Sequence, residues 1–567
     1  MQISYNKKTN SFIIKTDFGT DSLLTVQGMP ERRFRKSTSD WSAPALIRNV
    51  RYMYEHMNNK SMFTEEAHAV YGKLLRKLHR VDEPERPKFP VWYQFKHKPM
   101  AHQQQCLDRF YGLDAAAILF EQGLGKTYTS INLACAWHAD EQITGVLVLC
   151  PSSIKLVWTN ELSEHSPMPF VSHALESGKN KAAESFIEQT APRSGSPLPV
   201  FVAGIESLSQ GGGFEIIKDF VVRHRCLIIL DESSKIKNPD STRTERCLKL
   251  ADLSKKRLIL SGTSITQGIE DWYSQFSFLD RNILGFNSFY SFRDHFCETA
   301  SMEVARNRFV SKIVGYRNEQ ELFNLVSPYV MRVEKEDALD IPEKTHMTRF
   351  VQPTPAQKKL YKQMREEMAT EVDDVTYAVE SVLEQRLRLM QITGGFYPHD
   401  NGEFVEPRPI EGKNPKVEEV IAIAEELGDR KFVVWCQFHS EVAAVAARLK
   451  EAGIGSVQFH GRMSDEEKKA ADWAFKKDKS ARVMIATRAA AYGLTWVCAS
   501  YAVYFSLSYS LEEYSQSQDR IHRIGQKDKC TYIHLAMDNT IDIAVSRSLQ
   551  GKQAVATMAY QSIKEQS

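Results

Sequence analysis

Short runs of apolar residues alternate with amphipathic helical patterns along most of the chain. The first series comprises AAAILF (115–120), GVLVLC (145–150), PVFVAG (199–204), CLIILD (226–231) and RLILSG (257–262). A second series comprises KFVVWC (431–436), GSVQFH (455–460), ARVMIAT (481–487), YAVYFS (501–506) and YIHLAM (532–537). Runs of this kind are typical of parallel strands that are buried on both faces. The pattern therefore predicts an α/β fold with two halves and a cleft between them.

Other patterns flank and separate the two halves. Residues 1–27 alternate as short β segments (QISY, SFIIKT and SLLTVQ), whereas residues 44–80 have a helical period. The Pro- and charge-rich VDEPERPKFP (81–90) reads as a linker. Aromatic-rich helical sequence fills residues 268–345. We expect a small α+β domain at 1–90 and a helical insert between the α/β halves.

Composition narrows the class of protein. The chain has 567 residues, of which 42% are hydrophobic and 25% charged, so a mainly disordered, collagen-like or coiled-coil protein is excluded. The nine cysteines occur singly without a CxxC pair, which indicates reduced thiols and gives no zinc signature. No signal peptide or membrane span is apparent. We expect a soluble, cytoplasmic protein that binds no membrane.

Charge is distributed unevenly. The net charge is +2, but residues 1–100 contain 18 Lys/Arg and 10 Asp/Glu, which leaves −6 on the rest of the chain. This asymmetry indicates a basic module attached to near-neutral machinery.

The segment EQGLGKT (121–127) carries the sharpest chemical signal. It follows an apolar run and precedes a helical pattern, so Gly123 and Gly125 would let backbone N–H groups wrap phosphates. Lys126 would reach the β- and γ-phosphates and Thr127 would bind Mg²⁺. Phe120 replaces the usual first glycine, and the alternative is a glycine turn with a chance lysine.

Two adjacent carboxylates, Asp231 and Glu232, end the run CLIILD. Burying two carboxylates at the end of a strand costs free energy unless they bind a cation. Asp231 would hold the Mg²⁺ of a nucleotide, and Glu232 would polarise the attacking water. A solvated loop is the alternative.

The segment QSQDRIHRIGQ (516–526) places Arg520 and Arg523 three residues apart on an expected helical turn. Guanidinium groups stabilise the charge that develops on a transferring phosphoryl group. A surface basic patch is the alternative.

Together these motifs resemble those of the superfamily-two, Swi/Snf-type ATPases over roughly residues 90–550. HQQQCLDRF (102–110), the phosphate loop, LCPSSIKLVWTNELSEHSP (149–167), DESSKIKN (231–238) and SGTSITQGIEDW (261–272) are similar to motifs of the family's first lobe. VVWCQFHSEV (433–442), ATRAAAYGLTW (486–496) and QSQDRIHRIGQ resemble motifs of the second. The chain departs from the family pattern at Ser234, Ser264, His460 and Thr495.

The resemblance implies two RecA-like lobes, at 91–345 with a helical protrusion at about 268–345 and at 346–567 with a protrusion at about 350–412. It implies ATP and Mg²⁺ as cofactors, Gln103 at the adenine, and Gly493 and Gln516 near the nucleotide. Ser261, Gly262 and Thr263 would couple nucleotide state to DNA. Candidate DNA contacts are Ser153, Lys155 and Arg488.

The N-terminal segment VQGMPERRFRKSTSDW (26–41) is similar to the HepA-related (HARP) module of annealing helicases. Its candidate DNA contacts are Arg32, Arg33, Arg35, Lys36 and Trp41, whose charges and ring could bind backbone and stack on an unpaired base. The alternative is a small packing domain whose arginines are merely solvated.

The resemblance implies a DNA-stimulated ATPase that translocates along double-stranded DNA and remodels branched or forked DNA in repair or replication. Two alternatives stay open: a translocase that displaces a bound protein such as RNA polymerase, and a DNA-binding regulator without ATPase activity. We expect a monomer with double-stranded or forked DNA as partner, nucleoid-associated if the source is bacterial or phage.

Overall fold

The computed structural model describes residues 1–16, 21–57, 62–82, 87–176, 180–209, 212–305, 308–367, 369–372, 375–378, 382–397, 407–491 and 494–565. The chain folds into two compact units. The first contains Met1–Glu334 and Ala556–Ser567, and the second contains Lys335–Val555. The chain therefore passes between the units twice, after Glu334 and after Val555.

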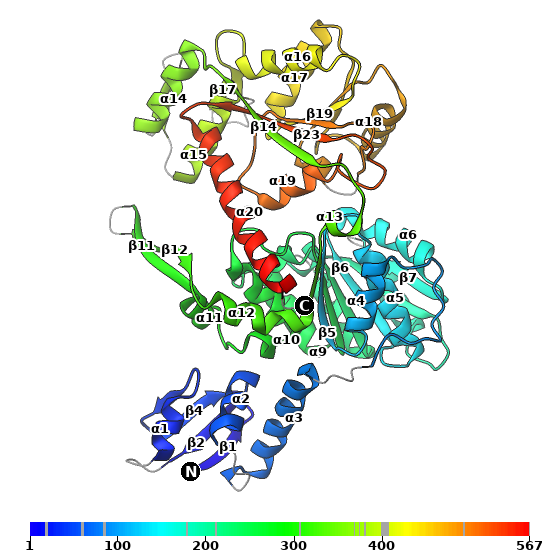
Figure 1. Cartoon of the computed structure of the whole chain (residues 1–567), viewed down its shortest axis with the longest axis vertical. Coiled ribbons are helices and arrows are strands. Elements are labelled where there is room, and N and C mark those ends of the chain that lie inside the picture. The colour runs from blue at the N-terminus through cyan, green and yellow to red at the C-terminus, as the bar shows by residue number, and fades with distance from the viewer. Residues whose placement is uncertain are drawn as a thin grey trace. The chain divides into compact units, whose positions relative to one another are not determined.

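The N-terminal part of the first unit is a small α+β fold (blue in Figure 1), as expected. Its antiparallel sheet has the order β1-β2-β4-β3, with β1 (Gln2–Asn6), β2 (Ser11–Lys15), β3 (Arg33–Arg35) and β4 (Asp40–Pro44). The helices are α1 (Asp21–Gln27), α2 (Ile47–His56) and α3 (Glu65–Asp82). Sheet and helices share an apolar core of their own, which includes Ile3, Phe12 and Val50.

The prediction of a β segment at SLLTVQ (22–27) is wrong, because these residues belong to α1. A strand would place Leu24 and Val26 on one face. Leu24 is instead 68% exposed while Val26 is fully buried.

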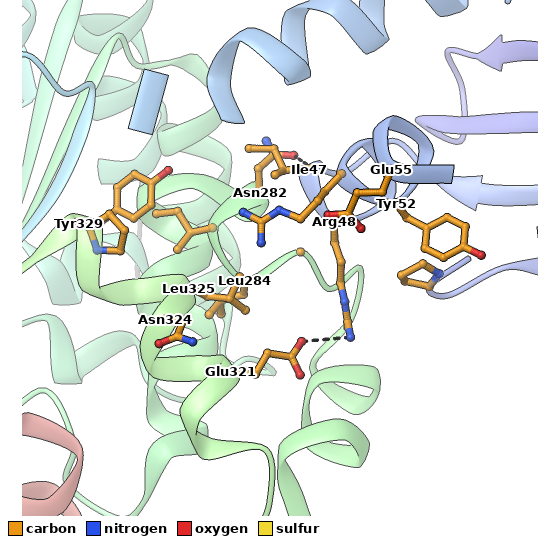
Figure 2. Close-up of a pocket in the computed structure, with 15 residues that line it drawn as sticks. Ile47, Arg48, Tyr52, Glu55, Asn282, Leu284, Glu321, Asn324, Leu325 and Tyr329 are labelled. Carbon is orange, nitrogen blue, oxygen red and sulfur yellow. Dashed lines mark hydrogen bonds and ion pairs between the residues drawn. The ribbon is translucent and has the colours of Figure 1, made fainter. Parts of the chain in front are cut away.

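The N-terminal fold contacts the rest of the first unit through α2. Figure 2 shows Arg48 directed toward Glu321, with which it forms an ion pair at 3.2 Å. Its guanidinium also lies 4.6 Å from the ring centroid of Phe286. The Ile47 N–H donates to Asn282 Oδ1 at 3.3 Å, beside a cavity of about 540 Å³. Polar and charged groups thus contribute to this junction.

A seven-stranded parallel sheet forms the centre of the first unit, in the order β13-β5-β10-β9-β6-β8-β7. Its strands are β5 (Ala115–Phe120), β6 (Gly145–Cys150), β7 (Phe170–Ala174), β8 (Leu198–Gly204), β9 (Cys226–Asp231), β10 (Lys256–Leu260) and β13 (Val330–Val333). The helices between them are α4 (Ala101–Phe110), α5 (Lys126–Ala139), α6 (Lys155–His165), α7 (Asn180–Gln189), α8 (Gly213–Arg223) and α9 (Thr242–Leu253). All five predicted strands are confirmed.

The insert at 268–345 is less helical than predicted. It contains α10 (Trp272–Leu284), α11 (Phe289–Phe296) and α12 (Glu319–Val326), but also an antiparallel hairpin of β11 (Cys297–Ala305) and β12 (Arg308–Tyr316). Its end supplies β13 to the main sheet. The sequence of residues 297–316 contains neither Asn-Gly nor Asp-Gly, so the strongest short-range hairpin signal is missing.

The second unit contains a six-stranded parallel sheet in the order β14-β23-β22-β19-β21-β20. Its strands are β14 (Lys344–Val351), β19 (Phe432–Trp435), β20 (Ser456–Phe459), β21 (Val483–Ala486), β22 (Tyr501–Tyr504) and β23 (Cys530–Met537). Its helices are α13 (Lys335–Ala338), α14 (Pro355–Glu367), α15 (Val382–Thr393), α16 (Pro415–Glu426), α17 (His439–Glu451), α18 (Asp465–Lys477) and α19 (Leu511–Gln518). The predicted two-part α/β fold is confirmed.

The insert expected at 350–412 is only partly helical. Beside α14 and α15 it contains the short pairs β15 (Ala369–Val372) with β16 (Val375–Ala378), and β17 (Phe396–Tyr397) with β18 (Arg408–Pro409). The last helix, α20 (Ile541–Glu565, red in Figure 1), has residues in both units. Neither α20 nor any other helix in the described part of the chain combines the length and apolar character needed to cross a membrane.

Candidate nucleotide site

The loop between β5 and α5 has the backbone of an anion-binding turn. Gly123 and Gly125 adopt φ values of +85° and +80°, and Gly125 caps the N-terminus of α5. The φ of Gly125 favours glycine, and a Cβ there would lie 2.2 Å from Gln103 Nε2, so the Gln103 amide would have to move. The free N–H groups of a helix N-terminus favour phosphate.

Gln103, the expected adenine contact, supports this loop. Its Nε2 donates to Leu124 O at 3.1 Å, and its Oε1 accepts the Met100 N–H at 2.9 Å. His102 also bonds Leu124 O through Nε2, at 2.9 Å. These two bonds use one of the two donor hydrogens and one of the two acceptor lone pairs of the Gln103 amide.

Lys126 begins α5 beside the loop. Its Nζ donates to Phe120 O at 3.0 Å, and a Cβ built on Gly262 would lie 3.7 Å from the same Nζ. The SGT segment expected to couple nucleotide state to DNA is therefore next to the ammonium. Thr127, the expected Mg²⁺ ligand, is the next residue of α5 and is half-buried.

Asp231 ends β9 as a buried carboxylate. Its Oδ2 accepts Trp158 Nε1–H at 2.9 Å, and its Oδ1 accepts the Glu232 N–H at 3.0 Å. Burial raises the pKa of the Asp231 carboxyl, while the Lys126 charge and the Trp158 hydrogen bond oppose this rise. A bound cation would favour the charged form. Asp231 thus fits the expected role of a Mg²⁺ ligand.

Glu232 occupies the left-handed region at φ +52° and ψ +60°, which is uncommon for a residue with a side chain. Such strain costs about 1–3 kcal/mol and is concentrated at functional sites. Glu232 is half-buried, which suits a group that polarises water.

Hydrogen bonds connect the carboxylate loop (231–238) with the SGTS loop (261–268). Ser233 Oγ donates to Gln275 Oε1 at 2.6 Å, and Gln275 Nε2 donates to Ser264 O at 2.8 Å. Lys237 Nζ donates to Thr266 Oγ1 at 2.6 Å. A displacement of one loop would therefore displace the other.

The residues expected to couple nucleotide state to DNA are buried or half-buried in the SGTS loop. Ser261 Oγ accepts the Thr263 N–H at 3.1 Å. Thr263 Oγ1 is buried and has no hydrogen-bond partner among the described residues.

In the second unit, Arg520 and Arg523 do not lie on a helical turn as predicted. Helix α19 ends at Gln518, and both arginines follow in irregular turns. They nevertheless converge on one segment: Arg520 Nη1 donates to Leu494 O at 2.6 Å, and Arg523 Nη1 donates to Thr495 Oγ1 at 2.8 Å. The unusual Thr495 therefore orients one of the two guanidinium groups.

Gln516 is the strongest sign of a missing ligand in this unit. Its side chain is 1% exposed, yet neither its Oε1 nor its Nε2 has a hydrogen-bond partner among the described residues. Buried amides are normally satisfied, so this amide fits a polar group supplied by a ligand. Gly493 lies outside the described residues.

The N-terminal candidates divide between two faces of an edge strand. Arg35 forms a bidentate pair with Asp40 at 2.6 and 2.9 Å, whereas Arg32, Arg33 and Lys36 are exposed. Burial opposes ionisation of Asp40, but hydrogen bonds from Arg35 and Thr38 lower its pKa overall.

The aromatic candidate lies on the other face of the strand pair. Trp41 opposes Phe34 across β3 and β4, with ring centroids 5.1 Å apart, whereas Arg35 opposes Asp40. Because neighbouring residues of a strand point to opposite faces, this aromatic pair does not share a face with Arg33 and Arg35.

The remaining DNA candidates differ in exposure. Ser153 and Arg488 are exposed. Arg488 begins the short helical turn Arg488–Ala491 and lines a small hollow with Gln437 and Ser506. Lys155 Nζ donates to Leu175 O at 2.6 Å, so part of its hydrogen-bonding capacity is already used.

Two further residues contact these loops without having been assigned a role from sequence. Arg332 donates to Gly262 O, and Tyr560 accepts the Ser264 N–H. Neither belongs to a phosphate-binding pattern, and Tyr560 lies about 300 residues after the loop it contacts, so no local signal marks it.

The chain matches two protein families. Residues 47–394 match the SNF2-related domain, and residues 413–525 match the helicase conserved C-terminal domain. A Sulfolobus solfataricus SWI2/SNF2 ATPase core in complex with dsDNA aligns with a TM-score of 0.38 and 19% identity over 84% of this chain and 98% of that one.

Curated relatives are distant and longer. A Caenorhabditis elegans homologue of "SWI/SNF-related matrix-associated actin-dependent regulator of chromatin subfamily A-like protein 1" is 24% identical over 76% of this chain and 57% of its own length. "DNA annealing helicase and endonuclease ZRANB3" of Bos taurus is 25% identical over 78% and 39%, respectively. "Putative ATP-dependent helicase/translocase YwqA" of Bacillus subtilis is 24% identical over 79% and 46%.

The alignments thus span about two fifths to three fifths of these relatives. The SNF2-related match covers more than half of this chain and contains the phosphate loop, the Asp231–Glu232 pair and the SGTS loop, while the second match contains Arg520 and Arg523. The chain belongs to the SNF2-related ATPase family, with a helicase C-terminal domain.

Proposed function

We propose that this protein is an ATP-dependent translocase that moves along double-stranded DNA and remodels branched or forked DNA. The observation that carries the proposal is the arrangement in the first unit, where a glycine loop suited to phosphate lies beside Lys126 and a buried Asp231. The names of relatives described as a DNA annealing helicase and a helicase/translocase support the DNA substrate.

In the proposed ATP site, the loop N–H groups and Lys126 bind phosphates, and Thr127 and Asp231 bind Mg²⁺. The magnesium ion would neutralise phosphate charge during transfer. Glu232 orients and polarises the attacking water. Arg520, Arg523 and Gln516 are proposed to bind the γ-phosphate.

The proposed DNA contacts belong to the two α/β domains and to the N-terminal domain at 1–90. Ser153, Lys155 and Arg488 would contact phosphates along the track, which gives affinity without sequence preference. We propose that the branched part of the DNA is recognised by Arg32, Arg33, Lys36 and Trp41. Arg35 would stabilise the pairing of β3 with β4 through its ion pair with Asp40.

The test is ATP hydrolysis by the full chain with no nucleic acid, single-stranded DNA, duplex DNA, forked DNA or RNA. We expect duplex and forked DNA to stimulate hydrolysis most. Stimulation by none of them, with ATP still bound, would indicate a regulator and overturn the translocase proposal.

Glu232→Gln isolates the proposed chemistry. The amide keeps the size of the side chain but cannot accept the proton of the attacking water, so ATP should still bind while turnover falls at least about 100-fold. Glu161→Gln, on the half-exposed surface of α6, is the matched control. Wild-type turnover by the Glu232 variant would refute the assigned role.

A further inference from the structure

The last turns of α20 pack inside the first unit. Residues from Ala556 onward belong to that unit, and Ala559, Tyr560 and Ile563 are buried. Tyr560 is only 5% exposed. A tyrosine buried to this extent needs a partner for its hydroxyl group.

The Tyr560 hydroxyl finds its partners on the SGTS loop. Its oxygen accepts the backbone N–H of Ser264 at 3.0 Å and that of Ile265 at 3.2 Å, and it lies 3.1 Å from Ser264 Oγ. Two buried N–H groups of the loop thus depend on one side chain from the far end of the chain. Loss of that acceptor would leave both N–H groups unsatisfied.

The Tyr560 ring has a second partner. The guanidinium of Arg332 stacks over it at 4.3 Å. Arg332 Nη1 donates to Gly262 O at 2.8 Å and to Leu119 O at 3.0 Å, and Nη2 pairs with Glu121 at 3.3 Å. The Arg332 side chain is 6% exposed. Arg332 therefore links the Tyr560 ring to Glu121, the first residue of the phosphate loop.

We propose that Tyr560 is a positioning residue for ATP hydrolysis: its hydroxyl fixes the SGTS loop beside Lys126, and its ring fixes Arg332 beneath the phosphate loop. This inference rests on the proposed ATPase function. It assigns to the end of α20 a part in the nucleotide site that no phosphate-binding motif contains. The two roles belong to different atoms of one side chain, so they can be separated by mutation.

Tyr560→Phe keeps the ring over Arg332 and removes only the hydroxyl. We expect kcat for DNA-stimulated hydrolysis to fall about ten-fold, the effect of leaving buried N–H groups unpaired, with an unchanged KM for ATP. Tyr560→Ala also removes the stack, so it should lower kcat further and raise KM about ten-fold because Arg332 loses its support. A merely structural role would lower the melting temperature without this split between kcat and KM.

Met558→Ala is the matched control, since Met558 is 41% exposed on the same turns of α20. Hydrogen exchange of peptides containing residues 264–265 gives a readout besides activity. Exchange should be faster in Tyr560→Phe and unchanged in Met558→Ala.

Unchanged kcat and unchanged exchange in Tyr560→Phe would overturn the inference. Absence of ATP hydrolysis by the wild-type chain would instead overturn the proposed function. In that case the hydrogen exchange result alone decides whether Tyr560 fixes the loop.

Discussion

At the residue scale, the second unit contains a carboxyl group that is poorly suited to ionisation. Glu441 is fully buried in α17, where its Oε2 accepts Ser506 Oγ–H at 2.6 Å and the N–H groups of Gln437 and Phe438. Burial nevertheless raises its pKa to about 7, against these hydrogen bonds and the nearby Lys416 charge. The protonated form is thus favoured in the folded state.

Because the folded-state pKa lies above the ordinary value of 4.5, this group stabilises the fold below pH 4.5 and loses that contribution as pH rises through 7. Glu441→Gln should remove up to about 3 kcal/mol of this pH dependence. The free energy of unfolding is measured by denaturation at pH 5 and pH 8. We expect it to be higher in Glu441→Gln than in wild type only at pH 8. Glu451→Gln, exposed at the end of the same helix, is the control; an equal effect of both variants would contradict the assignment.

Individual site residues differed in how far sequence could predict their surroundings. Lys126 and Asp231 follow directly from strand, turn and helix order, and the structure places both beside the expected loops. The adenine contact of Gln103 stays a prediction, whereas the hydrogen bond from its amide to Leu124 O depends on packing between α4 and the loop, which no local pattern indicates. Tyr560 could not be found, because its role arises only from a contact distant in sequence.

At the element scale, β3 is a short edge strand that presents charge. Among the described strands it pairs with β4 alone, and Arg33 and the adjoining Lys36 are exposed at this edge of the sheet. Charged edge strands resist pairing with other chains, and the same charges can bind phosphates.

Arg33→Ala and Lys36→Ala should each reduce the salt dependence of DNA binding by about one unit of slope, as expected for one lost phosphate contact. The measurement is affinity for forked and plain duplex DNA across salt concentrations. Lys8→Ala, which removes an exposed charge in the turn between β1 and β2, is the control. A loss equal to that of the control would exclude this edge as a DNA contact.

The core strands could be predicted element by element, because apolar runs such as CLIILD leave no face for water. The hairpin β11–β12 could not be predicted, because its sequence lacks a strong turn signal. Helix α1 could not be predicted either, because seven residues are too few to distinguish a helical period from that of a strand.

At the scale of the whole molecule, both passages of the chain between the units are anchored close to candidate ATP residues. Before the first passage, Arg332 bonds the SGT and phosphate loops; after it, Lys335 is 1% exposed and pairs with Asp519, next to Arg520. After the second passage, Tyr560 bonds the SGTS loop. A change at either passage would therefore act on the loops that we propose bind ATP.

The most direct measurement of the central claim is displacement of a labelled third strand from a DNA triplex by the full chain. Movement along the duplex should release the third strand only when ATP is present, and Glu232→Gln should release none. If duplex DNA stimulates ATP hydrolysis but the third strand stays bound, the protein does not translocate and the account is contradicted.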